Sequence, residues 1–234
     1  MAKDWIWAIV CPIIAYFIGS INFAYIFTKI KIKKNLWEVG TKNVGGFNAM
    51  LQTSGVYGAI AGTFDLLKGL GAVLTVVYLP IFDDVPLYAA DPKWELTWHS
   101  ITCILVAATV TLGHCYSIFL KFRGGRGLGA SMGILWFLNP LLLAVIFLIN
   151  LIFIFSTKYV RPAQFVGFII GLPIAFFIPI FPPWIPLELR TQLMLGLLAT
   201  GLIAVMFPKY LIPFIDMFRG KEYQIKEDHI DFKE

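Results

Sequence analysis

Residues 127–157 read GLGASMGILWFLNPLLLAVIFLINLIFIFST, a stretch without a charged side chain. A helix that crosses a bilayer needs ~20 mainly apolar residues. The Asn139-Pro140 pair inside the stretch is a turn signal, because proline disrupts the hydrogen bonding of a continuing helix. We therefore divide the stretch into a short span over 127–138 and a longer span over 140–157, with one kinked helix as the alternative.

The same pattern of long apolar runs and short polar breaks extends from Trp5 to Phe207. Of the 234 residues, 59% are hydrophobic and 14% are charged, and the mean hydropathy is +0.78. Soluble domains average ~45–50% apolar and ~25% charged residues. The composition therefore excludes a soluble enzyme, a nucleic-acid-binding domain and a disordered chain. It predicts an all-α, polytopic integral membrane protein.

We predict seven transmembrane helices in one membrane domain over residues 1–234, with six as the alternative if 127–157 is a single helix. The predicted spans are 5–27, 56–81, 98–118, 127–138, 140–157, 162–181 and 190–207.

Seven spans place most of the 19 lysines and arginines on one side of the membrane. These cations lie in the loops 28–55, 119–126 and 158–161 and in the tail from residue 208. Cytoplasmic loops carry the excess of lysine and arginine in membrane proteins. The bias predicts an N-terminus outside, a C-terminus in the cytoplasm and a multi-pass protein of the cell inner (cytoplasmic) membrane. It also accounts for the pI near 9.1.

Three stretches on the predicted cytoplasmic side are rich in glycine and polar residues. The first combines Gly19-Ser20 with GTKNVGGFN at 40–48, the second is DLLKG at 65–69, and the third combines Gly113-His114 with LKFRGGRGLG at 120–129. Their common side predicts that they contribute to one functional site.

The second stretch places Asp65 and Lys68 within a span, where charges are costly unless they pair or face water. Their three-residue spacing puts them on one helical face, so they form either a structural ion pair or part of a site.

The third stretch alternates glycines with cations. Glycine lets the backbone approach an anion and lysine or arginine supplies charge, so the loop predicts a phosphate cradle. Its order is not that of a nucleotide P-loop, and the alternative is a solvated inner turn. His114 beside the loop is an acid, a base, an anion contact or a structural histidine. Asn43 is a polar ligand or a turn residue.

Together the motifs resemble the acyl-phosphate-dependent glycerol-3-phosphate acyltransferase family of bacterial membranes (the PlsY type), whose members are compact seven-span proteins. The first family motif, Gly-Ser-Ile-Pro and then Gly-Ser-Gly-Asn-x-Gly-Ala-Thr-Asn, is similar to 19–22 and 40–48. The second resembles Asp65-x-x-Lys68-Gly69. The third, Gly-His followed by Phe-Lys-Gly-Gly-Lys-Gly, resembles Gly113-His114 and 122–127, and the closing Gly-x-Glu is similar to 220–222.

The chain departs from the family at several motif positions. Trp37 lies where the family has a phosphate-binding arginine, Thr41 replaces a serine, and Lys42 replaces a glycine. The asparagine and arginine before the closing motif are not evident. Arginine and lysine differ in phosphate geometry, so Lys42 returns a cation in a different arrangement. The departures fit either a divergent acyltransferase or a relative with a changed substrate.

The resemblance implies transfer of a fatty acyl group from acyl phosphate to the 1-hydroxyl of glycerol-3-phosphate, giving lysophosphatidic acid and phosphate in phospholipid biosynthesis. It implies no cofactor and no metal. The implied partners are acyl phosphate, glycerol-3-phosphate, membrane lipid and an upstream enzyme that produces acyl phosphate, but no nucleic acid. The alternatives are a transporter of a small phosphorylated anion and a non-catalytic lipid-binding subunit.

Each predicted site residue has a role in this scheme. Ser20 and Asn43 position the acyl phosphate, and His114 accepts the proton of the glycerol hydroxyl. Asp65 orients Lys68. The predicted phosphate-binding residues are Lys42, Gly45, Lys68, Gly69, Lys121, Arg123, Gly124, Gly125, Arg126 and Gly127.

Overall fold

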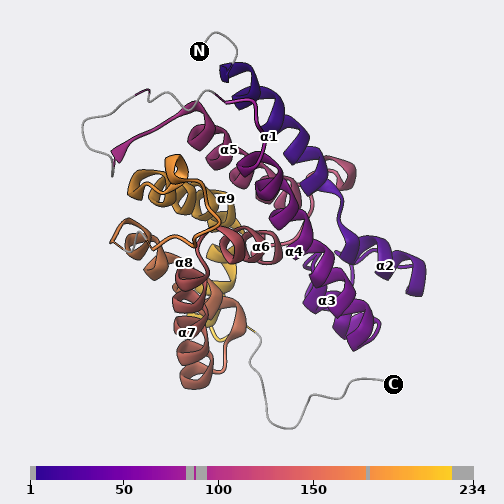
Figure 1. The fold of residues 1–234 in the computed structure, drawn as a ribbon. Helices are drawn as coiled ribbons and strands as arrows, with labels where there is room; N and C mark the ends of the chain where they lie inside the picture. The colour runs from indigo at the N-terminus through magenta and orange to yellow at the C-terminus, as the bar shows by residue number, and fades with distance from the viewer. Residues whose placement is uncertain (1–3, 83–86, 88–93, 178–179, 223–234) are drawn as a thin grey trace.

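The computed structural model describes residues 4–82, 87, 94–177 and 180–222 (Figure 1). Within these residues the chain forms nine α-helices and two three-residue 3-10 helices. The α-helices are α1 (Asp4–Ser20), α2 (Phe23–Ile32), α3 (Gly46–Gln52), α4 (Gly55–Val77), α5 (Trp98–Cys115), α6 (Leu128–Leu138), α7 (Pro140–Thr157), α8 (Val160–Phe177) and α9 (Gln192–Phe218).

Six segments are long and apolar enough to cross a membrane: the α1–α2 pair, α4, α5, α7, α8 and α9. The all-helical membrane fold is therefore confirmed. α6 is apolar but has 11 residues, so it rises only ~17 Å against a hydrocarbon core of ~30 Å. A seventh span at 127–138 stays a prediction.

The break at Asn139-Pro140 is a turn between two helices, as preferred from the sequence. Asn139 ends α6, and its side-chain oxygen accepts a hydrogen bond from the amide of Leu142 at 2.8 Å at the start of α7. Pro140 occupies the first helical position, where its missing N–H costs nothing.

The predicted ends of most spans differ from the helix ends by a few residues, and two spans differ more. The span predicted at 5–27 is wrong as one helix, because Asn22 caps a new helix by accepting from the amide of Tyr25 at 2.8 Å. The span predicted to end at 207 continues to Phe218, through Pro208 and Pro213. Tyr210 and Pro213 are buried, and this packing holds the extension helical despite the prolines.

Helix α5 is the centre of the molecule and packs against α1, α4 and α9. The buried share of the most apolar window is 61% in α5 but 17% in α7, whose window has a mean hydropathy of 2.5. α7 and α8 lie on the opposite side of the molecule from α2 and α3 (Figure 1). The most apolar helix is therefore the most exposed one, as expected for a surface that faces lipid.

Glycines allow two close helix pairs. A methyl group at Gly113 of α5 would collide with the carbonyl of Tyr16 in α1, and one at Gly69 of α4 would collide with the carbonyl of Ala130 in α6. Small residues allow such close packing in membranes. The structure therefore places Gly69 at a contact between helices, and its predicted phosphate contact stays a prediction.

Candidate active site

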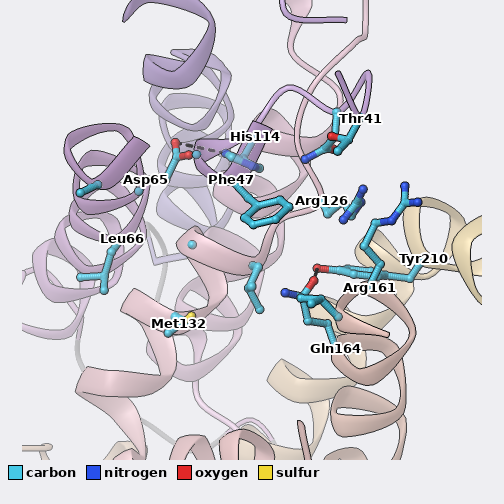
Figure 2. A pocket seen from close by; sticks show the side chains of 18 of the residues that line it. Thr41, Phe47, Asp65, Leu66, His114, Arg126, Met132, Arg161, Gln164 and Tyr210 are labelled. Carbon is cyan, nitrogen blue, oxygen red and sulfur yellow. Dashed lines mark hydrogen bonds and ion pairs between the residues drawn. The ribbon is translucent and has the colours of Figure 1, made fainter. Parts of the chain in front are cut away.

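A cavity of about 480 Å³ lies where segments from all three motif stretches meet the start of α8 and the end of α9. Figure 2 shows Asp65 and His114 on one side and Arg126, Arg161 and Tyr210 on the other, with Phe47 between them. The first turns of α6 and α8 also line it, through Leu128 and Gly129 and through Val160 and Arg161. Helix starts carry positive partial charge, so these turns favour an anion in the cavity.

The loop before α3 is organised by Asn48. The side-chain amide nitrogen of Asn48 lies 2.9–3.1 Å from the carbonyls of Leu36, Val39 and Asn43, to which it donates. Its side-chain oxygen accepts from the amide of Thr41 at 3.0 Å. These bonds hold Thr41 and Asn43 in the cavity lining.

Asp65, Lys68 and His114 form a buried charged cluster between α4 and α5. The Oδ1 atom of Asp65 lies 2.8 Å from the Nζ atom of Lys68 and 3.3 Å from the Nδ1 atom of His114. Lys68 also donates to the carbonyls of Gly19 and Ile21, each at 3.0 Å. Lys68 therefore links α4 to the end of α1, while Asp65 and His114 face the cavity.

The glycine-rich loop folds back on His114. The amide of Gly125 donates to the carbonyl of His114 at 3.0 Å, and a methyl group at Gly124 would collide with that same carbonyl. A methyl group at Gly125 would collide with the imidazole. The loop therefore positions His114, and its Gly125 amide is not free to bind an anion.

The opposite side of the cavity is basic. The guanidinium of Arg126 lies 5.8 Å from the centre of the Tyr210 ring, whose hydroxyl donates to Gln164 at 3.1 Å. The Nε atom of Arg161 donates to Glu222. The chain turns back after α9 to place Glu222 there, with the amides of Lys221 and Glu222 donating to the carbonyl of Asp216.

Burial shifts the pKa values of Arg126 and Glu222, which lie outside the helices on this side of the cavity. It lowers the pKa of Arg126 to about 10, and the charge of Arg161 adds to that effect. Burial raises the pKa of the Glu222 carboxyl, and the nearby Arg161 opposes the rise. Arg126 remains protonated at neutral pH, so this side of the cavity stays positively charged.

Comparison with known proteins fits this geometry. The sequence model of the glycerol-3-phosphate acyltransferase family matches residues 9–212. The chain belongs to this family.

Two relatives and one solved structure illustrate the similarity. A glycerol-3-phosphate acyltransferase of Anaplasma phagocytophilum (strain HZ) is 37% identical over 156 residues, which are 66% of this chain and 72% of the relative. One from Staphylococcus saprophyticus is 25% identical over 218 residues, 93% and 98% of the two chains. The crystal structure of PlsY (YgiH), an integral membrane glycerol 3-phosphate acyltransferase, in its glycerol 3-phosphate form has a TM-score of 0.72 at 23% identity and covers 94% of this chain and 96% of that one. That similarity shows a common fold.

Family membership confirms the resemblance inferred from the motifs and makes the protein a membrane acyltransferase. Of the site residues predicted from sequence, the cavity brings together Asn43, Gly45, Asp65, His114 and Arg126. The predicted residues that do not line it are Ser20, Lys42, Lys68, Gly69, Lys121, Arg123, Gly124, Gly125 and Gly127.

Several of these residues have structural partners that explain their position. The hydroxyl of Ser20 donates to the carbonyl of Tyr16 at 2.8 Å, and its predicted role of positioning acyl phosphate stays a prediction. The guanidinium of Arg123 lies 5.3 Å from the centre of the Trp37 ring, and Lys68 donates to the carbonyl of Gly19. The phosphate contacts predicted for these two residues stay predictions.

The remaining residues are turn residues outside the cavity. Lys42 and Lys121 are exposed and adopt φ of 57° and 55°, and Gly127 adopts φ of 89° at the start of α6. The phosphate contacts predicted at these positions stay predictions.

The cavity residues that sequence reasoning missed include Arg161, Gln164 and Tyr210. From the sequence, Arg161 was used only as one of the cations that assign the loop 158–161 to a side of the membrane. The available signal was its position, because it opens an apolar helix on the side where the motifs gather. Gln164 lies one turn further along that helix.

Proposed function

We propose that the protein transfers a fatty acyl group from acyl phosphate to the 1-hydroxyl of glycerol-3-phosphate, forming lysophosphatidic acid and inorganic phosphate. The observation that carries this proposal is one cavity with the Asp65–His114 pair on one side and the Arg126 cation on the other. The relatives, named glycerol-3-phosphate acyltransferases, support the acceptor.

The chemistry requires little from the protein beyond binding and charge. His114 accepts the proton of the attacking hydroxyl as its oxygen bonds to the acyl carbon, and Asp65 holds the imidazole in place. The bond from the acyl carbon to the phosphate oxygen then breaks, and phosphate leaves with the electron pair. Arg126 stabilises the negative charge on the phosphate, with Asn43 and the Gly45 segment as neighbouring polar contacts.

The test is acyl transfer by the purified protein in detergent, with palmitoyl phosphate and glycerol-3-phosphate and with palmitoyl-CoA as the control donor. We expect lysophosphatidic acid from palmitoyl phosphate alone. Binding of glycerol-3-phosphate without product would point to a changed donor or acceptor. If neither substrate bound, the acyltransferase proposal would be abandoned in favour of anion transport.

We also propose seven spans in a single domain of the cytoplasmic membrane, with the N-terminus outside. Arg126 precedes α6, Arg161 follows α7, and both line the same cavity. This supports two membrane crossings, in which α6 leads away from the cytoplasmic face and α7 returns to it. The Trp184 indole donates to the carbonyl of Phe137 at 3.0 Å, and the Trp184 carbonyl accepts from the hydroxyl of Tyr78 at 2.9 Å. These bonds support a position for the ends of α6 and α4 at the same, outer face of the membrane.

The topology predicts opposite labelling of two introduced cysteines in cells. Leu187→Cys, at a position 76% exposed, should react with a membrane-impermeant maleimide in intact cells. Lys121→Cys should react only after permeabilisation. The reverse pattern would contradict the proposed orientation. The same labelling at both positions would contradict three membrane spans between residues 121 and 187. Cys11 is replaced by serine in both, because it is the native cysteine that is not buried.

A further inference from the structure

The cations near the cavity are not equally free to bind an anion. Lys68 lies within hydrogen-bonding distance of two carbonyls and one carboxylate. Arg123 lies against the face of Trp37, which itself stacks on Tyr25 with 4.9 Å between ring centres. Lys42 is exposed and outside the lining. In the part of the chain that the structure describes, two cations line the cavity: Arg126 and Arg161.

Arg161 is held so that part of its guanidinium stays available. Its Nε atom is taken by Glu222, and no other hydrogen bond to the guanidinium occurs among the described residues. The Arg161 side chain is 22% exposed, whereas that of Glu222 is 1% exposed. The carboxylate therefore anchors one edge of the guanidinium from the protein side, and the Nη groups remain for a ligand.

Glu222 also makes the pair of arginines tolerable. Two like charges around one cavity repel each other, and a buried carboxylate beside one of them reduces that repulsion. The remaining Glu222 oxygen, Oε2, is buried without a hydrogen-bond partner among the described residues. The cluster of Arg126, Arg161 and Glu222 thus has a net positive charge and lines a cavity that can hold a small anion.

We infer that Arg161 is the second phosphate-binding residue of this site, gripping a phosphomonoester group together with Arg126, and that Glu222 is its positioning residue. Guanidinium groups bind phosphate through two parallel hydrogen bonds, which a lysine does not reproduce. The inference rests on the proposed function for its substrates, glycerol-3-phosphate and acyl phosphate, which share this chemical group.

The direct test is binding of glycerol-3-phosphate and of inorganic phosphate by calorimetry in detergent. Arg161→Gln should weaken both by about 10- to 100-fold, because a charge-assisted pair of hydrogen bonds is lost. Arg161→Lys should fall between that variant and the native protein. Lys158→Gln, which replaces an exposed lysine in the loop before α8, is the matched control and should change binding less than about twofold.

Glu222→Gln tests the positioning role. The amide retains an acceptor for Arg161 but loses the charge, so we expect a smaller weakening than in Arg161→Gln. Glycerol without phosphate should show no dependence on Arg161, which separates phosphate recognition from a general distortion of the cavity.

The outcomes separate this inference from the proposed function. If Arg161→Gln or, should that variant not fold, Arg161→Lys bound phosphate like the native protein while Lys42→Gln lost binding, Arg161 would be the wrong residue. Native protein that binds glycerol-3-phosphate through Arg161 but forms no lysophosphatidic acid would refute the proposed function and leave the inference standing. The KM of each substrate, with the other saturating, shows which phosphate group the arginine holds.

Discussion

Replacement of Arg126 by alanine is expected to lower the rate of acyl transfer by about 100-fold or more. The guanidinium lines the cavity on the aromatic face of Tyr210, and no hydrogen bond to it occurs among the residues that the structure describes. Because it is buried and makes no hydrogen bond to a described residue, it is a preorganised partner for the charge that develops on the leaving phosphate. Single-turnover transfer from palmitoyl phosphate measures the effect.

Two variants control this prediction. Arg126→Lys keeps the charge and restores the residue type of the third family motif, so it should lose less activity than Arg126→Ala. Arg123→Ala removes a neighbouring arginine that packs on Trp37 instead, so we expect little change in turnover. A native rate in Arg126→Ala would show that the cation of the reaction lies elsewhere.

Replacement of Lys68 by methionine is expected to destabilise the folded protein by about 3–5 kcal/mol, because it leaves a buried carboxylate without its cation. Asp65 is buried, and the carbonyls of Gly19 and Ile21 lose the same donor. The measurement is the thermal unfolding midpoint in detergent. Lys34→Met, at an exposed position, is the matched control and should unfold close to the native temperature.

A second substitution separates a structural role of Lys68 from a direct one. The double variant Asp65→Asn, Lys68→Met removes both charges and should recover part of the lost stability. If Lys68→Met instead unfolded at the native temperature and lost only affinity for phosphate, the direct phosphate contact predicted from the sequence would be correct.

Several parts of the fold follow from the sequence alone. The span predicted at 140–157 coincides with α7, and the turn at Asn139-Pro140 lies where the sequence placed it. These features depend on consecutive residues, since hydropathy and proline act within one helix or one turn. The grouping of the motif stretches around one cavity was also predictable, because charge bias assigns loops to a side of the membrane.

The tertiary structure decided which cations are held by protein partners and which are free to bind a ligand. Lys68 donates to the carbonyl of Gly19, 49 residues away, and Arg161 pairs with Glu222 over 61 residues. The first contact joins α4 to the end of α1, and the second joins the start of α8 to the turn after α9. A donor that such a contact has already taken is lost to a ligand. Residue type and spacing therefore determined which chemistry the chain carries, whereas helix packing decided which cations still face the cavity.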